Sequence, residues 1–138
     1  MSVIVYTDGG SRNNPGEAGI GAVIYNGKTK IAELSEYVGV QTNNWAEYEA
    51  LIRALKKVKQ LGLKGAPIEV RMDSELIVKQ MNREYQIKEE TLWKKYMEVH
   101  NMLVKDFKDV SFVHVPRDEN KEADALANEA MDAHNKMV

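Results

Sequence analysis

The chain contains no cysteine and only three prolines among its 138 residues. Without cysteine it can form no disulfide framework, no thiolate metal site and no cysteine nucleophile. It also lacks any apolar run long enough to cross a bilayer. The residues after Met1 do not show the charged segment followed by an apolar segment that is typical of a secretory signal. These absences predict a cytoplasmic protein that does not enter a membrane.

Neither sign of charge dominates the sequence. Nineteen basic and 21 acidic side chains give a formal charge of −2, so the field of the whole molecule does not attract nucleic acid. Lysines gather at Lys56, Lys57 and Lys59, but the solvated, basic end of a helix accounts for them. Any surface that binds phosphate must therefore be local.

Apolar residues are plentiful enough for one core. With 138 residues, of which 43% are hydrophobic, the chain is predicted to form a single domain over residues 1–138. No internal repeat and no low-complexity linker divides it. Because no apolar stripe is left over once this core is formed, the prediction for the oligomeric state is a monomer.

Hydrophobic periodicity and turn signals predict elements in the order βββ-α-β-α-α-β-α. Strands are expected at 3–6, 18–25, 29–40, 68–72 and 110–115, and helices at 44–61, 74–81, 90–104 and 120–134. The Asn26-Gly27 turn makes the first strands an antiparallel meander. Strands reached through helices are expected to run parallel to the first. The sequence thus predicts an α/β fold built on a mixed sheet.

The stretch VYTDGGSRNNPG, residues 5–16, places a carboxylate, Asp8, directly after an apolar run. An Asp at such a point often begins a turn by accepting hydrogen bonds from amides further on. Alternatively, the strand presents the carboxylate to a ligand, and a glycine-rich loop lets that ligand approach closely. Finding partners for Asp8 decides between the two interpretations.

Asp73 repeats this arrangement at the end of the predicted strand 68–72. Ligands bind beyond the carboxyl ends of parallel strands, and neighbouring strands would place Asp8 and Asp73 about 5 Å apart. Two anions that close together need a proton or a cation between them. The alternative is that Asp73 only caps the helix that follows, with Ser74, and the local sequence leaves both open.

Two further acids, Glu47 and Asp124, lie on predicted helices. Glu47 comes third after Asn44, which is typical of a capping box, yet it shares a face with Leu51 and so points toward the sheet, where a carboxylate needs a compensating partner. Asp124 lies on the margin of the apolar stripe that includes Met131, where a solvated charge is the alternative. Accident is a poor explanation for four acids on four elements, so a shared site is predicted.

In combination these motifs resemble ribonuclease H type 1 over nearly the whole chain. The matching segments are TDGGSRNNPG at 7–16, TNNWAEYEAL at 42–51, MDSELIVKQM at 72–81 and NKEADALANEA at 120–130. Lysines within 83–103 are offset by glutamates, which is similar to the archaeal-type members that lack a basic handle. The resemblance implies the ribonuclease H-like fold, an α/β structure with a five-stranded mixed sheet and helices on both faces.

The resemblance also implies a chemistry. Asp8, Glu47, Asp73 and Asp124 would hold two Mg²⁺ ions, or Mn²⁺ as a substitute, and the enzyme would hydrolyse the RNA strand of an RNA/DNA hybrid to 5′-phosphate and 3′-hydroxyl ends. Hard oxygen ligands suit Mg²⁺, and two such ions can activate a water and stabilise the leaving oxygen. Asp8 and Asp73 would be the central ligands, and the glycines after Asp8 would let a nucleic-acid backbone pass over it.

Substrate-binding positions follow from the same resemblance. They correspond here to Gly9, Ser11, Asn14, Thr42, Asn43, Asn44 and Glu75. Thr42 matches a position that holds a DNA-strand phosphate, and the others match residues at the hybrid. Contacts to 2′-hydroxyls in a shallow minor groove distinguish RNA from DNA. Turn and cap chemistry is the alternative for the asparagines.

Two positions depart from the common family pattern. Many members have a His in the loop before the last acid, but here that loop holds Arg117, and His114 lies within the predicted strand. Arg117 is therefore expected to steady phosphate charge, because an Arg stays protonated and cannot act as a base. Glu75 replaces a hybrid-contacting Gln and is expected to weaken binding. Tyr85 and Trp93 could line a DNA channel, although the helical spacing of Trp93 also fits a core residue.

Three functions are compatible with these residues. The prediction is a metal-dependent endonuclease acting on RNA/DNA hybrids. A catalytically silent hybrid-binding module would account for Glu75 and for the missing loop His, but it has no need of an anionic cluster facing a polyanion. A related nuclease that also cuts double-stranded RNA is the third possibility.

Overall fold

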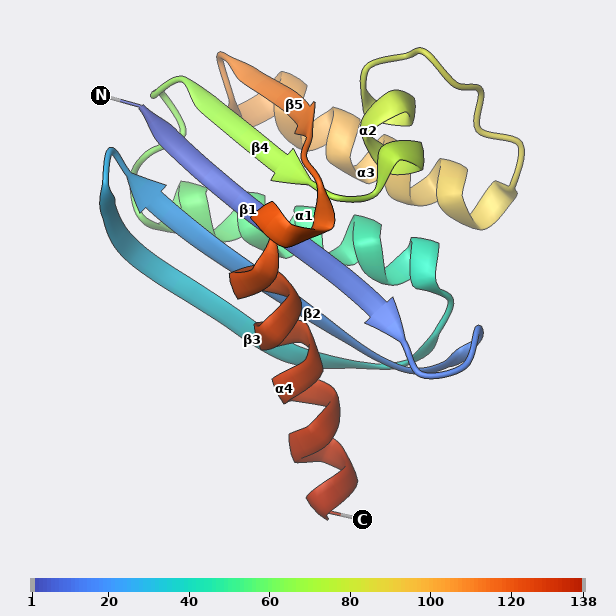
Figure 1. The fold of residues 1–138 in the computed structure, drawn as a ribbon. Coiled ribbons are helices and arrows are strands. Elements are labelled where there is room, and N and C mark those ends of the chain that lie inside the picture. Colours follow the sequence, from blue (N-terminus) through green and yellow to red (C-terminus); the bar gives the residue numbers. More distant parts are fainter. Residues whose placement is uncertain (1, 138) are drawn as a thin grey trace.

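A computed structural model describes residues 2–137, in which a mixed sheet lies between helices (Figure 1). Its strands within these residues are β1 (Val3–Ser11), β2 (Gly16–Asn26), β3 (Thr29–Gln41), β4 (Ile68–Met72) and β5 (Val110–His114), in the order β3-β2-β1-β4-β5. The pairs β1/β2 and β2/β3 are antiparallel, whereas β1/β4 and β4/β5 are parallel. The predicted meander and the predicted parallel strands are both confirmed.

Strand β1 continues past the point where the sequence predicted its end. Its ladder with β2 runs on from Asp8 to Ser11, whereas its parallel partner β4 ends at Met72, opposite Thr7. The prediction that a loop begins after Asp8 is therefore wrong, and the two glycines that follow are strand residues. Asp8 still stands where the parallel part of the sheet ends.

Helices cover both faces of this sheet, as expected. They are α1 (Asn43–Gln60), α2 (Glu75–Met81), α3 (Glu90–Asp106) and α4 (Lys121–Met137), with a short 3-10 turn, η1 (Arg117–Glu119), before α4. Helix α1 packs on β1 and β2 with α3 against its outer side, and α4 crosses β1, β2 and β3 on the opposite face (Figure 1). No helix among residues 2–137 is long and apolar enough to span a bilayer.

Two helix caps differ from the prediction. Thr42 caps α1, with its hydroxyl accepting a first-turn amide at 3.2 Å, so Glu47 lies in the second turn and the predicted capping box is wrong. Ser74 caps α2, accepting an amide at 3.3 Å, so the cap considered for Asp73 and Ser74 is confirmed for Ser74 and wrong for Asp73. Neither acid has the local structural role that the sequence offered as an alternative.

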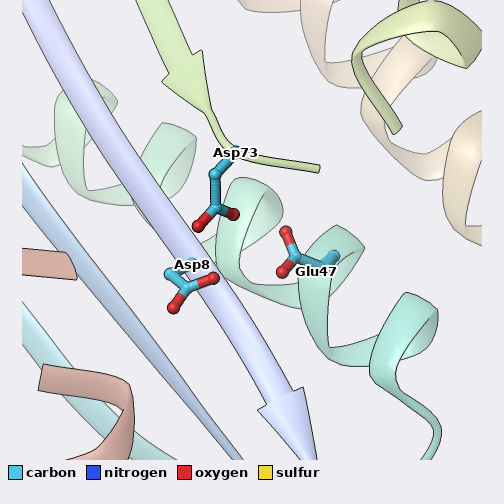
Figure 2. A group of neighbouring side chains, drawn as sticks. All are labelled: Asp8, Glu47 and Asp73. Carbon is cyan, nitrogen blue, oxygen red and sulfur yellow. The ribbon is translucent and has the colours of Figure 1, made fainter. Parts of the chain in front are cut away.

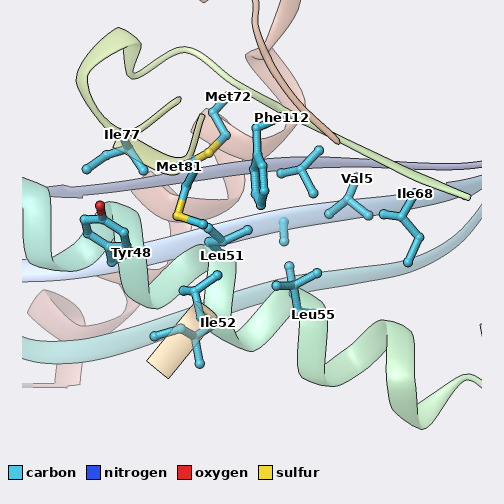
Figure 3. Packing of buried hydrophobic residues seen from close by; sticks show 14 of the residues in the cluster. Val5, Tyr48, Leu51, Ile52, Leu55, Ile68, Met72, Ile77, Met81 and Phe112 are labelled. Carbon is cyan, nitrogen blue, oxygen red and sulfur yellow. The ribbon is translucent and has the colours of Figure 1, made fainter. Parts of the chain in front are cut away.

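The main core lies between α1 and the sheet (Figure 3). Leu51, Ile52 and Leu55 on α1 are fully buried against strand residues such as Val5, and burying each such side chain contributes about 1.5–3 kcal/mol. The 3.6-residue spacing of these residues is the pattern that predicted the helix.

On the opposite face α4 approaches the sheet unusually closely. A Cβ atom added at Gly19 of β2 would lie 2.6 Å from the carbonyl oxygen of Ala127, so glycine is required where the helix crosses. Ala123, Ala127 and Ala130 are buried in this contact. The short side chains fix α4, and with it Asp124, at the edge of β1.

Candidate active site

Three carboxylates meet where β1 and β4 cease to be paired (Figure 2). Asp8 comes from β1, Asp73 follows β4, and Glu47 reaches them from α1. Each offers an oxygen, and these oxygens all lie within 4.8 Å of one another. The proximity predicted for Asp8 and Asp73 is confirmed, and its cause is the parallel pairing of their strands.

Glu47 reaches the cluster because α1 lies directly against β1 at Gly9. A Cβ atom at Gly9 would lie 2.7 Å from the backbone nitrogen of Glu47, so a larger residue would push the helix away. The Gly9 amide donates a hydrogen bond to Oε1 of Glu47 at 3.3 Å. The other oxygen, Oε2, is buried and has no hydrogen-bond partner among residues 2–137. Gly9 is thus explained by helix packing and not by the mobile loop that the sequence suggested.

Burial and mutual repulsion disfavour the ionised forms of these acids. Burial, followed by the charge of Asp73, raises the pKa of Asp8 to about 8. Burial and the proximity of Asp8 raise the pKa of Glu47 well above its usual value. Burial also raises the pKa of Asp73, although the nearby Arg117 guanidinium counteracts this. Without a counter-charge the cluster would therefore retain protons near neutral pH.

The cluster fits a divalent cation. Ionised carboxylates are acceptors only, and hard oxygen ligands of this kind are those that Mg²⁺ and related ions prefer. The buried oxygen of Glu47 would gain the partner that it lacks within the described chain. A cation would also remove the repulsion that raises the pKa of Asp8.

Asp124 lies at the same site but outside the tight cluster. Among residues 2–137, the carboxylates found within mutual ligand distance are Asp8, Glu47 and Asp73. Asp124 lines a pocket of about 470 Å³ with these three, and its side-chain interaction with Asp8, followed by its charge, contributes to the raised pKa of Asp8. The structure therefore brings all four acids to one pocket, and ligation of a metal by Asp124 stays a prediction.

Arg117 lies on the wall of this pocket, at the start of η1. Its charge lowers the pKa of Asp73 against the effect of burial, so the guanidinium is close to the carboxylates. His114 is the last residue of β5 and is exposed. It does not line the pocket as far as residues 2–137 define it. This placement agrees with the preference for Arg117, whose role in catalysis stays a prediction.

Asn120 supports the site from beside the pocket, a role that was not predicted from the sequence. It is 1% exposed, and its Nδ2 donates a hydrogen bond to the carbonyl oxygen of Thr7 at 2.9 Å. Burial raises the pKa of Asp73, and Asn120, like Arg117, opposes that rise. Asn120 thus ties the start of α4 to β1 beside Asp8. Its sequence signals were its position at the expected start of the last helix and at the start of the matching segment 120–130, and neither gave it a role.

Several predicted substrate residues hold the β1–β2 connection against α1. Oδ1 of Asn43 accepts hydrogen bonds from the amide and the hydroxyl of Ser11, at 2.7 and 3.1 Å. Oδ1 of Asn14 accepts the amide of Asn43 at 3.0 Å, and Thr42 caps α1. These residues therefore do make turn and cap hydrogen bonds. Ser11, Asn43 and Asn44 also line the pocket, so contacts to a substrate stay a prediction.

Glu75, Tyr85 and Trp93 are not among the described residues that line this pocket. Glu75, in the first turn of α2, pairs with Lys79 at 2.8 Å. Trp93 is 48% exposed and stacks on Tyr96, so the alternative that placed Trp93 in the core is wrong. Tyr85 and Trp93 line a second pocket, which lies along the connection between α2 and α3.

Comparisons with known proteins agree with this architecture. Residues 6–130 match the model of the reverse transcriptase-like family. Ribonuclease HI of Halobacterium salinarum is 44% identical over 131 residues, which are 94% of this chain and 64% of that protein. The crystal structure of RNase H1 from the same archaeon superimposes with a TM-score of 0.91 at 42% identity, covering 96% of this chain and 99% of that one.

A second solved structure decides the family. LC11-RNase H1, solved in complex with an RNA/DNA hybrid, is 48% identical with a TM-score of 0.93, and the match covers 96% of this chain and 98% of that one. The chain belongs to the ribonuclease H type 1 family. The ribonuclease H-like fold is thereby confirmed. The chain also matches a bifunctional protein of Mycobacterium tuberculosis at 43% identity, but it spans only 36% of that protein's length.

Proposed function

We propose that the chain is a metal-dependent endonuclease that hydrolyses the RNA strand of RNA/DNA hybrids to 5′-phosphate and 3′-hydroxyl products. The observation that carries this proposal is the cluster of Asp8, Glu47 and Asp73, whose oxygens lie within 4.8 Å of one another. It is supported by similarity to LC11-RNase H1, which was solved with an RNA/DNA hybrid. Burying such a cluster is costly unless a cation compensates it.

The four acids of the pocket, Asp8, Glu47, Asp73 and Asp124, would hold two Mg²⁺ ions, or Mn²⁺ in their place. When bound, such ions polarise the reacting phosphate and help to activate the attacking water. The chain itself holds these carboxylates in position. The paired strands fix Asp8 and Asp73, and the Gly9 amide orients Glu47.

Other pocket residues suit the recognition of a hybrid. The Arg117 guanidinium offers charged donors that match phosphate oxygens. Ser11, Asn43 and Asn44 offer neutral donors and acceptors beside the carboxylates, as contacts to 2′-hydroxyl groups require. Because the acids would repel a polyanion, binding at this site depends on these donors and on the metal.

The test is cleavage of an end-labelled RNA/DNA hybrid, with Mg²⁺ and separately with Mn²⁺, by the wild type and by Asp8→Asn. Hybrid binding is measured in parallel, and an RNA duplex and a DNA duplex of the same sequence serve as comparison substrates. Metal-dependent cutting of the hybrid that disappears in Asp8→Asn while binding persists would support the proposal. Binding without cutting under either metal would instead identify a silent binding module. Equal cutting of the RNA duplex would identify a nuclease of wider preference.

A further inference from the structure

Arg12 is a cation that α4 holds at the edge of the acidic pocket. Its Nη1 pairs with Oδ1 of Asp132 at 2.6 Å, and its Nη2 lies 3.5 Å from both the carbonyl oxygen and Oδ1 of Asn128. Arg12 lines the pocket that contains the carboxylates, and its side chain is still 37% exposed. The guanidinium is therefore directed by α4 and remains accessible to a ligand.

The backbone that carries Arg12 is fixed as well. The Arg12 amide donates to the carbonyl oxygen of Glu17 at 2.9 Å. On either side of it, the Ser11 amide donates to Asn43 at 2.7 Å and Asn14 accepts from Asn43 at 3.0 Å. The connection between β1 and β2 is thus tied to β2 and to α1. A cation held in this way loses little conformational freedom when it binds an anion.

The position of Arg12 relative to the carboxylates follows from α4. Asp124, Asn128 and Asp132 follow one another at four-residue intervals on one side of the helix, so the two contacts of Arg12 lie about 6 and 12 Å along the axis from Asp124. Successive phosphates of a nucleic-acid strand advance by about 3.4 Å along the duplex axis. A strand whose scissile phosphate lay at the carboxylates and which continued along α4 would therefore bring a phosphate near Arg12 roughly two to four nucleotides away.

Charge complementarity favours a phosphate at this position. Among the described residues that line the pocket, the two cations are Arg12 and Arg117, and they come from different connections of the chain. The bond from Arg12 to Asp132 is a surface ion pair, because the Asp132 side chain is 57% exposed, and such pairs contribute little. A phosphate that accepts two parallel hydrogen bonds can therefore compete for the guanidinium.

We propose that Arg12 binds a non-scissile phosphate of the RNA strand and so positions that strand across the carboxylates. This inference rests on the proposed function and adds a residue to it. The competing explanation is a purely structural one, in which the ion pair with Asp132 only fastens the β1–β2 connection to α4. The two explanations differ in what the removal of each partner does.

The experiment compares Arg12→Gln with Asp132→Asn, which breaks the same ion pair but keeps the guanidinium. Steady-state cleavage of the hybrid gives kcat and KM. Equilibrium binding in the Asp8→Asn background gives the dependence of log Kd on log salt concentration. Lys64→Gln is the charge-matched control, because Lys64 is exposed in the α1–β4 connection, at the end of the sheet away from the pocket.

We expect Arg12→Gln to raise KM roughly five- to twentyfold with kcat changed less than about twofold. Its salt slope should fall by about 0.8, the loss of one phosphate contact. Arg12→Lys keeps the charge, so its salt slope should equal that of the wild type. Its KM should lie between those of Arg12→Gln and the wild type. Asp132→Asn should not raise KM, because it removes an anion that competes with the phosphate. Lys64→Gln should match the wild type in KM and in slope.

Two results would overturn the inference while the proposed function stood. One is a wild-type KM and salt slope in Arg12→Gln. The other is an equal rise in KM and an equal fall in melting temperature in Arg12→Gln and Asp132→Asn, which would assign the pair a structural role. A wild type that neither binds nor cuts the hybrid would overturn the proposed function, and the role of Arg12 with it.

Discussion

At the scale of single residues, Asp8 makes the metal-free protein sensitive to pH. Burial raises the pKa of Asp8 from 3.8 to about 8, so between these values the folded protein binds a proton that the unfolded chain has released. The stabilising contribution is complete below about pH 4 and is lost as pH rises to about 8. We therefore expect the free energy of unfolding, measured with urea in EDTA, to fall between pH 5 and pH 8.

Asp8→Asn should weaken this dependence, of which Glu47 keeps a part through its own burial, and be more stable than the wild type at pH 8 by about 2 kcal/mol. Asp109→Asn is the control, since Asp109 is an exposed acid before β5 and its replacement should leave the pH dependence in place. A wild-type stability that increases from pH 5 to pH 8 in EDTA would contradict the burial argument.

The raised pKa of Asp8 also predicts how the protein responds to added metal. A cation among Asp8, Glu47 and Asp73 favours their ionised forms. It should therefore stabilise the folded chain most near pH 8, where protonation of Asp8 no longer stabilises it. At pH 8, Mn²⁺ at ten times its dissociation constant should raise the free energy of unfolding by about 1.4 kcal/mol. Thermal melts with and without Mn²⁺ measure this, and an equal shift in Asp8→Asn would mean that the ion binds elsewhere.

Gly9 and Gly10 are adjacent in sequence but should respond differently to alanine. A Cβ atom at Gly9 would lie 2.7 Å from the backbone of Glu47, whereas one at Gly10 would have its nearest contact at 3.8 Å. Gly9→Ala should therefore cost about 2–4 kcal/mol of stability and lower kcat, because α1 and Glu47 must move. Gly10→Ala should change stability by less than about 1 kcal/mol. Urea denaturation of the two variants makes the comparison, and equal losses would disprove it.

At the scale of elements, the periodic segments could be predicted, and β4 was predicted at both ends, whereas the end of β1 and the cap of α1 could not. The helical spacing of residues such as Leu51 and Leu55 located α1, because burial of one face enforces that spacing. The end of β1 was misplaced because glycine is weak in strands, and only the pairing with β2 keeps Gly9 in the ladder. Thr42 and Asn44 are both good caps, and the choice between them depends on where β3 ends.

The site shows the same division. Asp8 and Asp73 could be placed together because both follow from the topology of parallel strands. Asn120 could not be found, because its value lies in a hydrogen bond to Thr7, a residue 113 positions away. Nor does any sequence pattern state that Asp124 lines the pocket without joining the tight cluster, since that depends on how closely α4 crosses β2.

Helix α2 contains a charge arrangement that should limit substrate affinity. Glu75 pairs with Lys79 at 2.8 Å, and Lys79 also donates to the hydroxyl of Tyr85 at 3.3 Å. Glu75→Gln removes an anion and frees Lys79, so KM for the hybrid should fall by about threefold. Stability should change by less than about 0.5 kcal/mol, because the ion pair is exposed. A KM that rises in Glu75→Gln would show instead that the carboxylate itself contacts the substrate.

At the scale of the whole molecule, a formal charge of −2 means that the attraction of a hybrid depends on a few local cations. Arg12 and Arg117 line the pocket, and Lys79 lies on the neighbouring helix. Three phosphate contacts, each worth about 0.8 in the slope of log Kd against log salt concentration, predict a slope of about 2.4. Between 50 and 200 mM KCl, Kd should then rise roughly thirtyfold.

Fluorescence anisotropy of a labelled hybrid with Asp8→Asn, which is expected to bind without cutting, measures this slope. Arg117→Gln should reduce it by one contact, and Lys64→Gln should leave it unchanged because only cations at the interface release counterions. A slope near zero would mean that neutral donors and the metal hold the hybrid. A slope above about 5 would require an extended basic surface, which the balance of charges in this chain does not indicate. The number of phosphates bound thus connects the overall charge of the chain to the few cations beside its carboxylates.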